Sequence, residues 1–176
     1  TNTTEITMFA KFYFVFDAPI WMIQAWFPSG PAGILRRFIK LIQTYPNTQF
    51  SCLVDDREAA EEIQDDCFFQ NIQLSVFIDL NVGMHRTGIL PEKASSLIDY
   101  IDSTSNLSLK GLHAYDGHIR DENIETRKQH AFSDLSSFRK LVDELNRELE
   151  LVVGGTPSFL VHCQNPMYVC SPGTFV

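Results

Sequence analysis

The sequence lacks an excess of basic residues and lacks a long uninterrupted apolar run. It has 14 Lys and Arg against 22 Asp and Glu, a formal net charge of -8. Because no basic stripe is present to neutralise phosphates, this balance argues against a nucleic-acid partner. The longest apolar stretch, residues 12–27, is broken by Asp17 and Pro19, so a membrane span is not expected either.

Cysteine is scarce, and its spacing follows no known pattern. The four cysteines form neither a close pair nor a metal-type motif: Cys52, Cys67, Cys163 and Cys170. The first residues, TNTTEI, have neither the charged nor the apolar region of a secretory signal. We therefore expect buried free thiols rather than disulfides, and a cytoplasmic protein.

The remaining composition is that of one globular domain. The chain has 176 residues, of which 44% are hydrophobic and 20% charged. Short apolar runs predict strands at residues 19–27, 50–54, 74–80, 109–116 and 149–155. Amphipathic stretches between them predict helices, which indicates a parallel α/β sheet with right-handed crossovers. Periodicity leaves open whether the sheet is a complete doubly wound one or part of a (β/α)8 barrel.

Helix boundaries are marked by proline and aspartate. Pro31 and Pro91 suit first helical turns, and Asp55 and Asp56 supply a helix cap before REAAEEIQ. The longest helix is predicted within residues 123–150. Its apolar residues recur at helical spacing and are expected to face the core: Phe132, Leu135, Phe138, Leu141, Val142 and Leu145.

Three predicted strands end in segments that could carry chemistry. They are NVGMHRTG (residues 81–88), YDGH (115–118) and GGTPS (154–158), and strand carboxyl ends are where parallel α/β folds bind ligands. Two glycines let backbone amides approach a ligand, and Thr156 and Ser158 add hydroxyl donors, which suits a phosphate. A tight turn that binds nothing explains GGTPS equally well.

Each single residue also has two interpretations. Arg86 suits a carboxylate, a phenolate oxygen or a phosphate, or is a solvated surface arginine. His118, past the strand end, suits an acid/base role, whereas His113 inside the strand suits the packed core. Tyr115 offers a face on which an aromatic ring can stack, or is a core tyrosine. All of them are expected at the carboxyl ends of the predicted strands, an edge that we call the mouth. Their shared placement there favours a ligand-binding site.

The dispersed motifs resemble one known family. FIDLNVGMHRTGI (residues 77–89) is similar to the strand-and-loop signature of fold-type III pyridoxal-phosphate enzymes, the alanine racemase-like barrels. LKGLHAYDGHIR (109–120) and VVGGTPSF (152–159) are similar to the next strand and the phosphate-binding turn of the D-threonine aldolase and D-serine dehydratase branch. CSPGTFV (170–176) resembles the entry into that family's C-terminal β-domain. The motifs occur in family order and span nearly the whole chain.

The resemblance implies a parallel (β/α) TIM barrel, present here as an incomplete segment without its first strands. Residues 1–168 would form the barrel segment that binds pyridoxal phosphate, and residues 169–176 would start the C-terminal β-domain.

The resemblance also implies the roles of single residues. Arg86 would lie near the oxygen of the pyridoxal ring, and Tyr115 would contact the ring. His118, which follows Tyr115 closely in the sequence, would be the catalytic candidate. The cofactor phosphate would be held by the turn Gly154, Gly155 and Thr156.

Two parts of the family pattern have no counterpart. The family's Schiff-base lysine lies on the first barrel strand, and neither Lys11, in a helix-like segment, nor Lys110, at the wrong end of a strand, matches it. The metal ligands of the branch lie in the C-terminal β-domain, beyond Val176. We therefore expect an internal piece of a larger enzyme that is inactive when alone. Because its sheet edges are uncovered, we also expect poor solubility or compensating association.

The resemblance implies a pyridoxal-phosphate-dependent lyase that acts on D-3-hydroxy amino acids, by aldol cleavage or by dehydration. It further implies a homodimer, a small-molecule substrate and a divalent metal in the missing domain. Two alternatives stay open: a non-catalytic, truncated module that binds pyridoxal phosphate or phosphate, and an amino-acid racemase.

Overall fold

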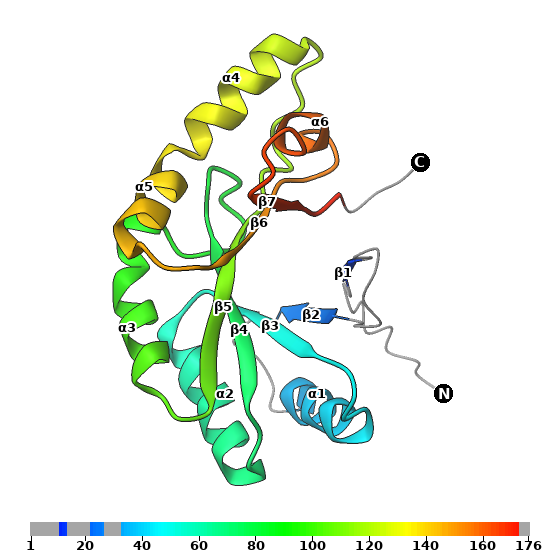
Figure 1. Ribbon diagram of the computed structural model, residues 1–176, viewed down its shortest axis with the longest axis vertical. Coiled ribbons are helices and arrows are strands. Elements are labelled where there is room, and N and C mark those ends of the chain that lie inside the picture. Colours follow the sequence, from blue (N-terminus) through cyan, green and yellow to red (C-terminus); the bar gives the residue numbers. More distant parts are fainter. Residues whose placement is uncertain (1–10, 14–21, 27–32, 173–176) are drawn as a thin grey trace.

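The structure, a computed structural model, describes residues 11–13, 22–26 and 33–172. Its strands form one seven-stranded sheet in sequence order (Figure 1). They are β1 (Lys11–Tyr13), β2 (Met22–Trp26), β3 (Phe50–Val54), β4 (Leu74–Leu80), β5 (Leu107–Ala114), β6 (Glu150–Val153) and β7 (Tyr168–Cys170). β1 is antiparallel to β2, and all later neighbours are parallel. Within the described residues no pairing joins β1 to β7, so the barrel is not closed.

The five predicted strands correspond to β2 through β6, and the structure adds two short strands at the ends of the series. Lys11 belongs to β1, where it is paired with Gln24 of β2. The helix-like prediction for Lys11 is therefore wrong, because pairing with a neighbouring strand outweighs a weak local preference. The rest of that helix-like segment, residues 5–10, lies outside the described residues.

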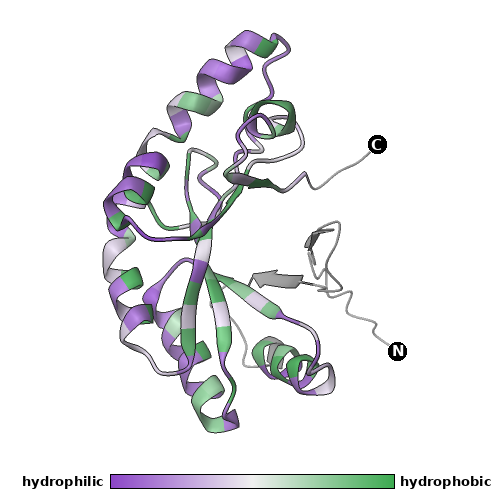
Figure 2. Cartoon of the chain, viewed as in Figure 1, coloured by the Kyte–Doolittle hydropathy of each residue, from purple (hydrophilic) through white to green (hydrophobic). Residues whose placement is uncertain are grey.

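Helices connect the parallel strands. They are α1 (Gly33–Thr44), α2 (Arg57–Gln70), the 3-10 turn η1 (Pro91–Lys93), α3 (Ser95–Ser103), α4 (Ile124–Asp134), α5 (Ser136–Leu145) and α6 (Phe159–His162). Figure 1 shows α2, α3 and α5 one above another along the same side of the central strands. Hydrophilic residues alternate with hydrophobic ones along these helices, as expected where one face packs on a sheet (Figure 2). No helix in the described part of the chain is long and apolar enough to cross a bilayer.

The central strands are buried on both faces, as in other parallel sheets. In β4 the consecutive residues Val76, Phe77 and Ile78 are all fully buried. Val76 and Ile78 belong to the large core cluster beneath the helices, whereas Phe77 packs with Leu53 and Val152 in a second, small cluster. Because side chains alternate along a strand, this second cluster marks the inner face of the partial barrel.

Alternation places polar side chains further along that inner face. Asp79 follows Phe77 by two residues in β4, and His113 follows Gly111 by two residues in β5. The two are direct neighbours across the strands. Toward the carboxyl ends of the strands, the inner face therefore becomes polar beyond its apolar cluster.

The predicted long helix over residues 123–150 is interrupted. α4 ends at Asp134, and α5 begins at Ser136 after Leu135, whose ψ of 6° departs from helical geometry. Leu135, Phe138 and Leu141 are buried as predicted, and Val142 and Leu145 are partly buried.

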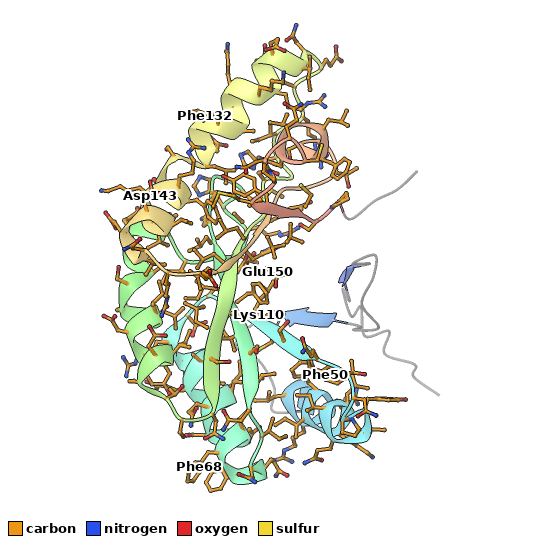
Figure 3. The ribbon with its side chains drawn as sticks, viewed as in Figure 1. Phe50, Phe68, Lys110, Phe132, Asp143 and Glu150 are labelled. Carbon is orange, nitrogen blue, oxygen red and sulfur yellow. The ribbon has the colours of Figure 1, made fainter. Side chains whose placement is uncertain are left out.

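Phe132 is 68% exposed, so its predicted inward position is wrong (Figure 3). Once the helix breaks, its apolar spacing no longer runs on one continuous face. α4 instead buries Ala131, and the Arg139 guanidinium lies 3.8 Å above the Phe132 ring.

All four cysteines are free thiols, as predicted. Cys52 and Cys67 are fully buried, whereas Cys163 is exposed, so the expectation of burial is correct for only part of the set. Burial raises the pKa of the Cys67 thiol to about 11, with the Asp66 carboxylate adding to the rise. This thiol is therefore protonated and unreactive at neutral pH.

Strand β7 lies at the predicted boundary between the barrel segment and the C-terminal β-domain. Residues 168–170 pair in parallel with β6 and so belong to the same sheet as the barrel strands. The predicted boundary at residue 168 falls inside this strand. The end of the predicted domain entry, residues 173–176, lies outside the described residues, and the following domain stays a prediction.

Gly111 gives a test of how tightly the inner face is packed. β5 shifts register against β4 at this point, and a Cβ on Gly111 would lie 2.0 Å from the Glu150 carbonyl oxygen and 2.6 Å from the Phe77 ring. We expect Gly111→Ala to lower the free energy of unfolding by about 1–3 kcal/mol, measured by urea denaturation, because backbone cannot yield as a flexible side chain can. Ser108→Ala, at an exposed position of the same strand, is the control and should change it by less than about 0.5 kcal/mol. An unchanged midpoint for Gly111→Ala would contradict the packing described here.

Candidate functional site

The three segments singled out by their sequence follow β4, β5 and β6, which are consecutive neighbours in the sheet. Because these strands are parallel, their carboxyl ends lie at the same edge, and the segments at residues 81–88, 115–118 and 154–158 come together there. None of the three segments contains a lysine.

The loop that carries Arg86 is held by two aspartates from two strands. The Thr87 hydroxyl donates to Asp79 Oδ2 at 2.9 Å, and the Gly88 amide donates to Asp55 Oδ2 at 2.9 Å. At the start of the loop, Asn81 Oδ1 accepts hydrogen bonds from two further backbone amides. These contacts fix the loop on both sides of Arg86.

Asp79 also connects this loop to the next strand. His113 Nδ1 lies 2.6 Å from Asp79 Oδ1, and both side chains are almost fully buried. The prediction of a packed histidine at position 113 is therefore correct, and its packing includes a buried carboxylate. One carboxylate thereby joins the Arg86 loop to β5.

Arg86 and Tyr115 lie close together at the mouth, where the sequence placed both of them. The Arg86 guanidinium carbon lies 5.2 Å from the centroid of the Tyr115 ring, within the range of a cation–π contact. Two glycines also lie close to the ring: a Cβ on Gly117 would lie 2.2 Å from the Tyr115 hydroxyl oxygen, and one on Gly155 would lie 3.0 Å from a ring carbon. The glycines therefore let the ring lie directly against the third segment.

His118 takes a position at the rim, beside helix α4. Its Nε2 lies 2.8 Å from Asp134 Oδ2, and the pair covers Gly83, where a Cβ would lie 2.9 Å from the same nitrogen. A surface depression of about 490 Å³ opens next to this pair. It is lined by His118, Ile119, Arg120, Asp121, His130 and Asp134. The pairing with Asp134 orients the imidazole, a feature that an acid/base group requires, and the catalytic role of His118 stays a prediction.

The third segment forms a turn whose first two amides are engaged inside the protein. Gly154 has a φ of +93°, a conformation that favours glycine, and its amide donates to the Ala114 carbonyl at 2.8 Å. The Gly155 amide donates to Asp116 Oδ1 at 2.9 Å. Thr156 is the exposed residue of the turn. The two glycines therefore shape the turn, and their amides already have acceptors.

Ser158 differs from what its sequence position suggested. It was expected to offer a hydroxyl to a ligand, but it is fully buried and its hydroxyl donates to Asp116 Oδ1 at 2.5 Å. The expectation is wrong because a buried carboxylate lies within reach and competes for the hydroxyl. His162 Nε2 lies 2.6 Å from the other oxygen of Asp116.

The predicted capping role of Asp55 is wrong, and sequence reasoning assigned no function to Asp79, Asp116 or His162. Asp56 caps α2 as predicted, by accepting from the Ala59 amide, whereas Asp55 turns to the Arg86 loop instead. The available signal was position, since each of the three acids at residues 55, 79 and 116 lies at or just after the end of an apolar strand. Carboxylates in apolar surroundings need hydrogen-bond donors, and the amides and hydroxyls of the loops supply them.

Neither candidate lysine lies in the three segments. The side chain of Lys110 lies over the Phe77 ring, with Nζ 3.5 Å from Glu150 Oε2, and both charged side chains are partly exposed (Figure 3). Four residues separate it from the end of β5, roughly 13 Å along the strand. Lys110 is therefore on the wrong side of the sheet's middle for this mouth, as its sequence position indicated.

The residues at the mouth fit the chemistry of pyridoxal phosphate in kind. A guanidinium and an aromatic face meet at Arg86 and Tyr115, which suits a planar ring with a phenolic oxygen. The glycine turn packs against the same tyrosine and exposes Thr156. A ring and a phosphate could thus be held side by side, without a lysine from these segments.

Comparisons with known proteins agree with this architecture. The sequence model of the family described as "Alanine racemase, N-terminal domain" matches residues 30–176. The pyridoxal phosphate homeostasis protein of Aquifex aeolicus (strain VF5) is 31% identical over 102 residues, which are 57% of this chain and 42% of that protein.

Two solved structures show the same fold. The D-threonine aldolase of Filomicrobium marinum is similar with a TM-score of 0.68 at 20% identity, over 81% of this chain and 41% of the aldolase. The alanine racemase of Clostridium difficile 630 is similar with a TM-score of 0.59 at 15% identity, over 77% of this chain and 35% of the racemase. The chain spans less than half the length of each of these relatives. The predicted resemblance and the predicted fold, part of an alanine racemase-like barrel, are both confirmed.

Asp55 gives a pH-dependent test of the loop anchor. Burial raises the pKa of Asp55 above its ordinary value of 3.8, the charges of Asp79 and Asp56 add to the rise, and the Gly88 hydrogen bond opposes it. The folded state therefore binds this proton more tightly than the unfolded state, so stability falls as pH rises through 3.8 toward the raised pKa. Asp55→Asn removes the charge and keeps an acceptor for the Gly88 amide. We expect a higher melting temperature than wild type at pH 7, with the gain disappearing below about pH 4.

Calorimetry at both pH values measures this difference. Asp56→Asn is the matched control, because asparagine caps a helix about as well as aspartate, and it should give no comparable gain at pH 7. A lower melting temperature for Asp55→Asn at pH 7 would contradict the assigned cost of the buried charge.

Proposed function

The chain belongs to the alanine racemase N-terminal domain family, and on this premise we propose that its mouth binds pyridoxal 5'-phosphate. The observation that carries the proposal is the contact of Arg86 with Tyr115 beside the turn of Gly154, Gly155 and Thr156. The two parts of the cofactor, a ring and a phosphate, have separate matching surfaces here. The name of the Aquifex aeolicus relative supports the same ligand.

The tasks of the protein in this proposal are binding and orientation. Arg86 would hold the phenolic oxygen of the ring, Tyr115 would contact the ring face, and the turn with Thr156 would hold the phosphate. His118, oriented by Asp134, would hold or move a proton at the rim. When bound, the cofactor supplies an electron sink for the amino-acid substrate.

We propose further that the reaction served is lyase chemistry on D-3-hydroxy amino acids. Aldol cleavage would convert D-threonine to glycine and acetaldehyde, and dehydration would convert D-serine to pyruvate and ammonia. Support comes from the three ordered motifs at the mouth and from a TM-score for the D-threonine aldolase that exceeds that for the alanine racemase. Any divalent metal would be bound outside the residues described, among which no metal-type cluster occurs.

A second candidate function is binding without catalysis. It is favoured by the curated relative, which is named for pyridoxal phosphate homeostasis. Assays of the chain, and of any longer protein encoded with it, separate the two functions. Formation of glycine or pyruvate from the D-amino acids supports the lyase. Bound cofactor with no turnover in the longer protein supports the binding module.

The binding proposal predicts a loss of affinity in Arg86→Ala. Removal of a guanidinium that holds a charged oxygen is expected to weaken pyridoxal phosphate binding about tenfold or more, measured by absorbance titration of the purified chain. Arg57→Ala is the matched control, because the Arg57 guanidinium lies 4.4 Å from the Tyr100 ring centroid in a similar stack between helices α2 and α3. Equal affinity in Arg86→Ala and wild type would contradict the proposed placement of the ring.

A further inference from the structure

Asp116 is a buried carboxylate that accepts three hydrogen bonds from the third segment and the helix after it. Its donors are the Gly155 amide at 2.9 Å, the Ser158 hydroxyl at 2.5 Å and His162 Nε2 at 2.6 Å. Asp116 and Ser158 are fully buried, and His162 is 4% exposed. A carboxylate removed from water is costly unless its oxygens are satisfied, so all members of this cluster depend on each other.

The cluster connects two strand ends. Asp116 follows β5 by two residues, whereas its three partners all follow β6. His162 also lies directly beneath the turn, because a Cβ on Gly154 would come within 2.7 Å of its ring. The carboxylate thus holds the turn at Gly155 by a hydrogen bond, and the imidazole packs against it at Gly154.

The geometry does not suit a nucleophilic serine. The Ser158 hydroxyl donates to the Asp116 carboxylate, and the His162 imidazole contacts the other oxygen of that carboxylate, so the histidine is not placed as the base of a serine–histidine pair. Burial also keeps the serine away from any substrate. A positioning role is the one that these contacts support.

We propose that Asp116 is a positioning residue for phosphate recognition, an inference that rests on the proposed function of the mouth. By drawing the Gly155 amide and the Ser158 hydroxyl inward, Asp116 sets the turn so that Thr156 is presented outward, where the phosphate is held. Asp116 itself touches no ligand. We therefore expect its effect at the phosphate end of the ligand, because the donors to Asp116 belong to the turn and the helix after it and not to the Arg86 loop.

Pyridoxal phosphate and pyridoxal, two forms of vitamin B6, test the two ends of the ligand separately. Pyridoxal phosphate has the ring and the phosphate, whereas pyridoxal has the ring alone. Asp116→Asn keeps the size of the side chain but replaces one acceptor oxygen by a donor, which faces Ser158 or His162. We expect this variant to bind pyridoxal phosphate about tenfold more weakly, the loss that follows from one charge-assisted hydrogen bond, with pyridoxal binding unchanged.

Asp79→Asn is the matched control. It removes the carboxylate from the other buried Asp–His pair, His113 with Asp79, at the same 2.6 Å separation. Asp79 holds the Arg86 loop rather than the turn, so this variant should weaken both vitamin forms by the same factor. A general loss of stability would likewise affect both forms, and comparable melting temperatures of the two variants would exclude it as the cause of a selective effect.

Ser158→Ala keeps the inference testable if Asp116→Asn does not fold. It removes one donor from the carboxylate and one acceptor from the Gly155 amide without adding volume. The same selective loss for pyridoxal phosphate is expected, at a smaller factor. Equal losses for both vitamin forms in the foldable variants, or no loss at all, would overturn the inference.

Inorganic phosphate separates failure of this inference from failure of the proposed function. It is titrated into the chain while the amide signal of Thr156 is followed by NMR. If neither vitamin form binds, but phosphate shifts this signal in wild type and not in Asp116→Asn, the proposed cofactor is wrong and the role of Asp116 holds. If pyridoxal phosphate binds and Asp116→Asn binds it with wild-type selectivity, the function holds and the inference is overturned. If phosphate leaves the wild-type signal unchanged and neither form binds, both are overturned.

Discussion

Carboxylates at the ends of parallel strands are the interaction on which the candidate site depends. Asp55, Asp79 and Asp116 follow or end three successive strands, and each accepts a backbone amide or a hydroxyl from a loop beyond its own strand. Loops at this edge carry donors that the sheet itself cannot satisfy, and buried carboxylates need such donors. These hydrogen bonds hold two loops in fixed positions, the Arg86 loop and the glycine turn. Rigid loops are in turn what a binding site for a small ligand requires.

The outer face of the sheet carries most of the apolar core, whereas the inner face leads to the candidate site. The outer face packs against helices in one large cluster, whereas the inner face has a small apolar cluster around Phe77 and becomes polar toward the mouth. Burial of the outer face supplies the apolar area that holds the strands together. The inner face can then accommodate Asp79 and His113, a buried polar pair that would be costly without its mutual hydrogen bond.

Much of the fold and part of the site could be predicted from the sequence. Apolar runs located five strands, and the positions after three of them brought Arg86, Tyr115 and the glycine turn to one edge. Phe132 shows the limit, because helical spacing does not report a break at Leu135. Ser158 shows another limit, since a hydroxyl at a strand end looks available until its acceptor is placed beside it. Asp116 is 42 residues away in the chain, and local pattern says nothing of such a contact.

The sequence by itself determined the class of fold, the location of the mouth and the family resemblance, because these depend on periodicity and on the order of motifs. Only the tertiary structure decided which donors turn inward to acceptors of the protein. The amide of Gly155 and the hydroxyl of Ser158 are turned inward by Asp116, and His118 is turned toward Asp134 on a helix that follows it. The physical reason is that a hydrogen-bond donor takes the acceptor nearest in space, and proximity between β5 and β6 is created by the packing of the sheet.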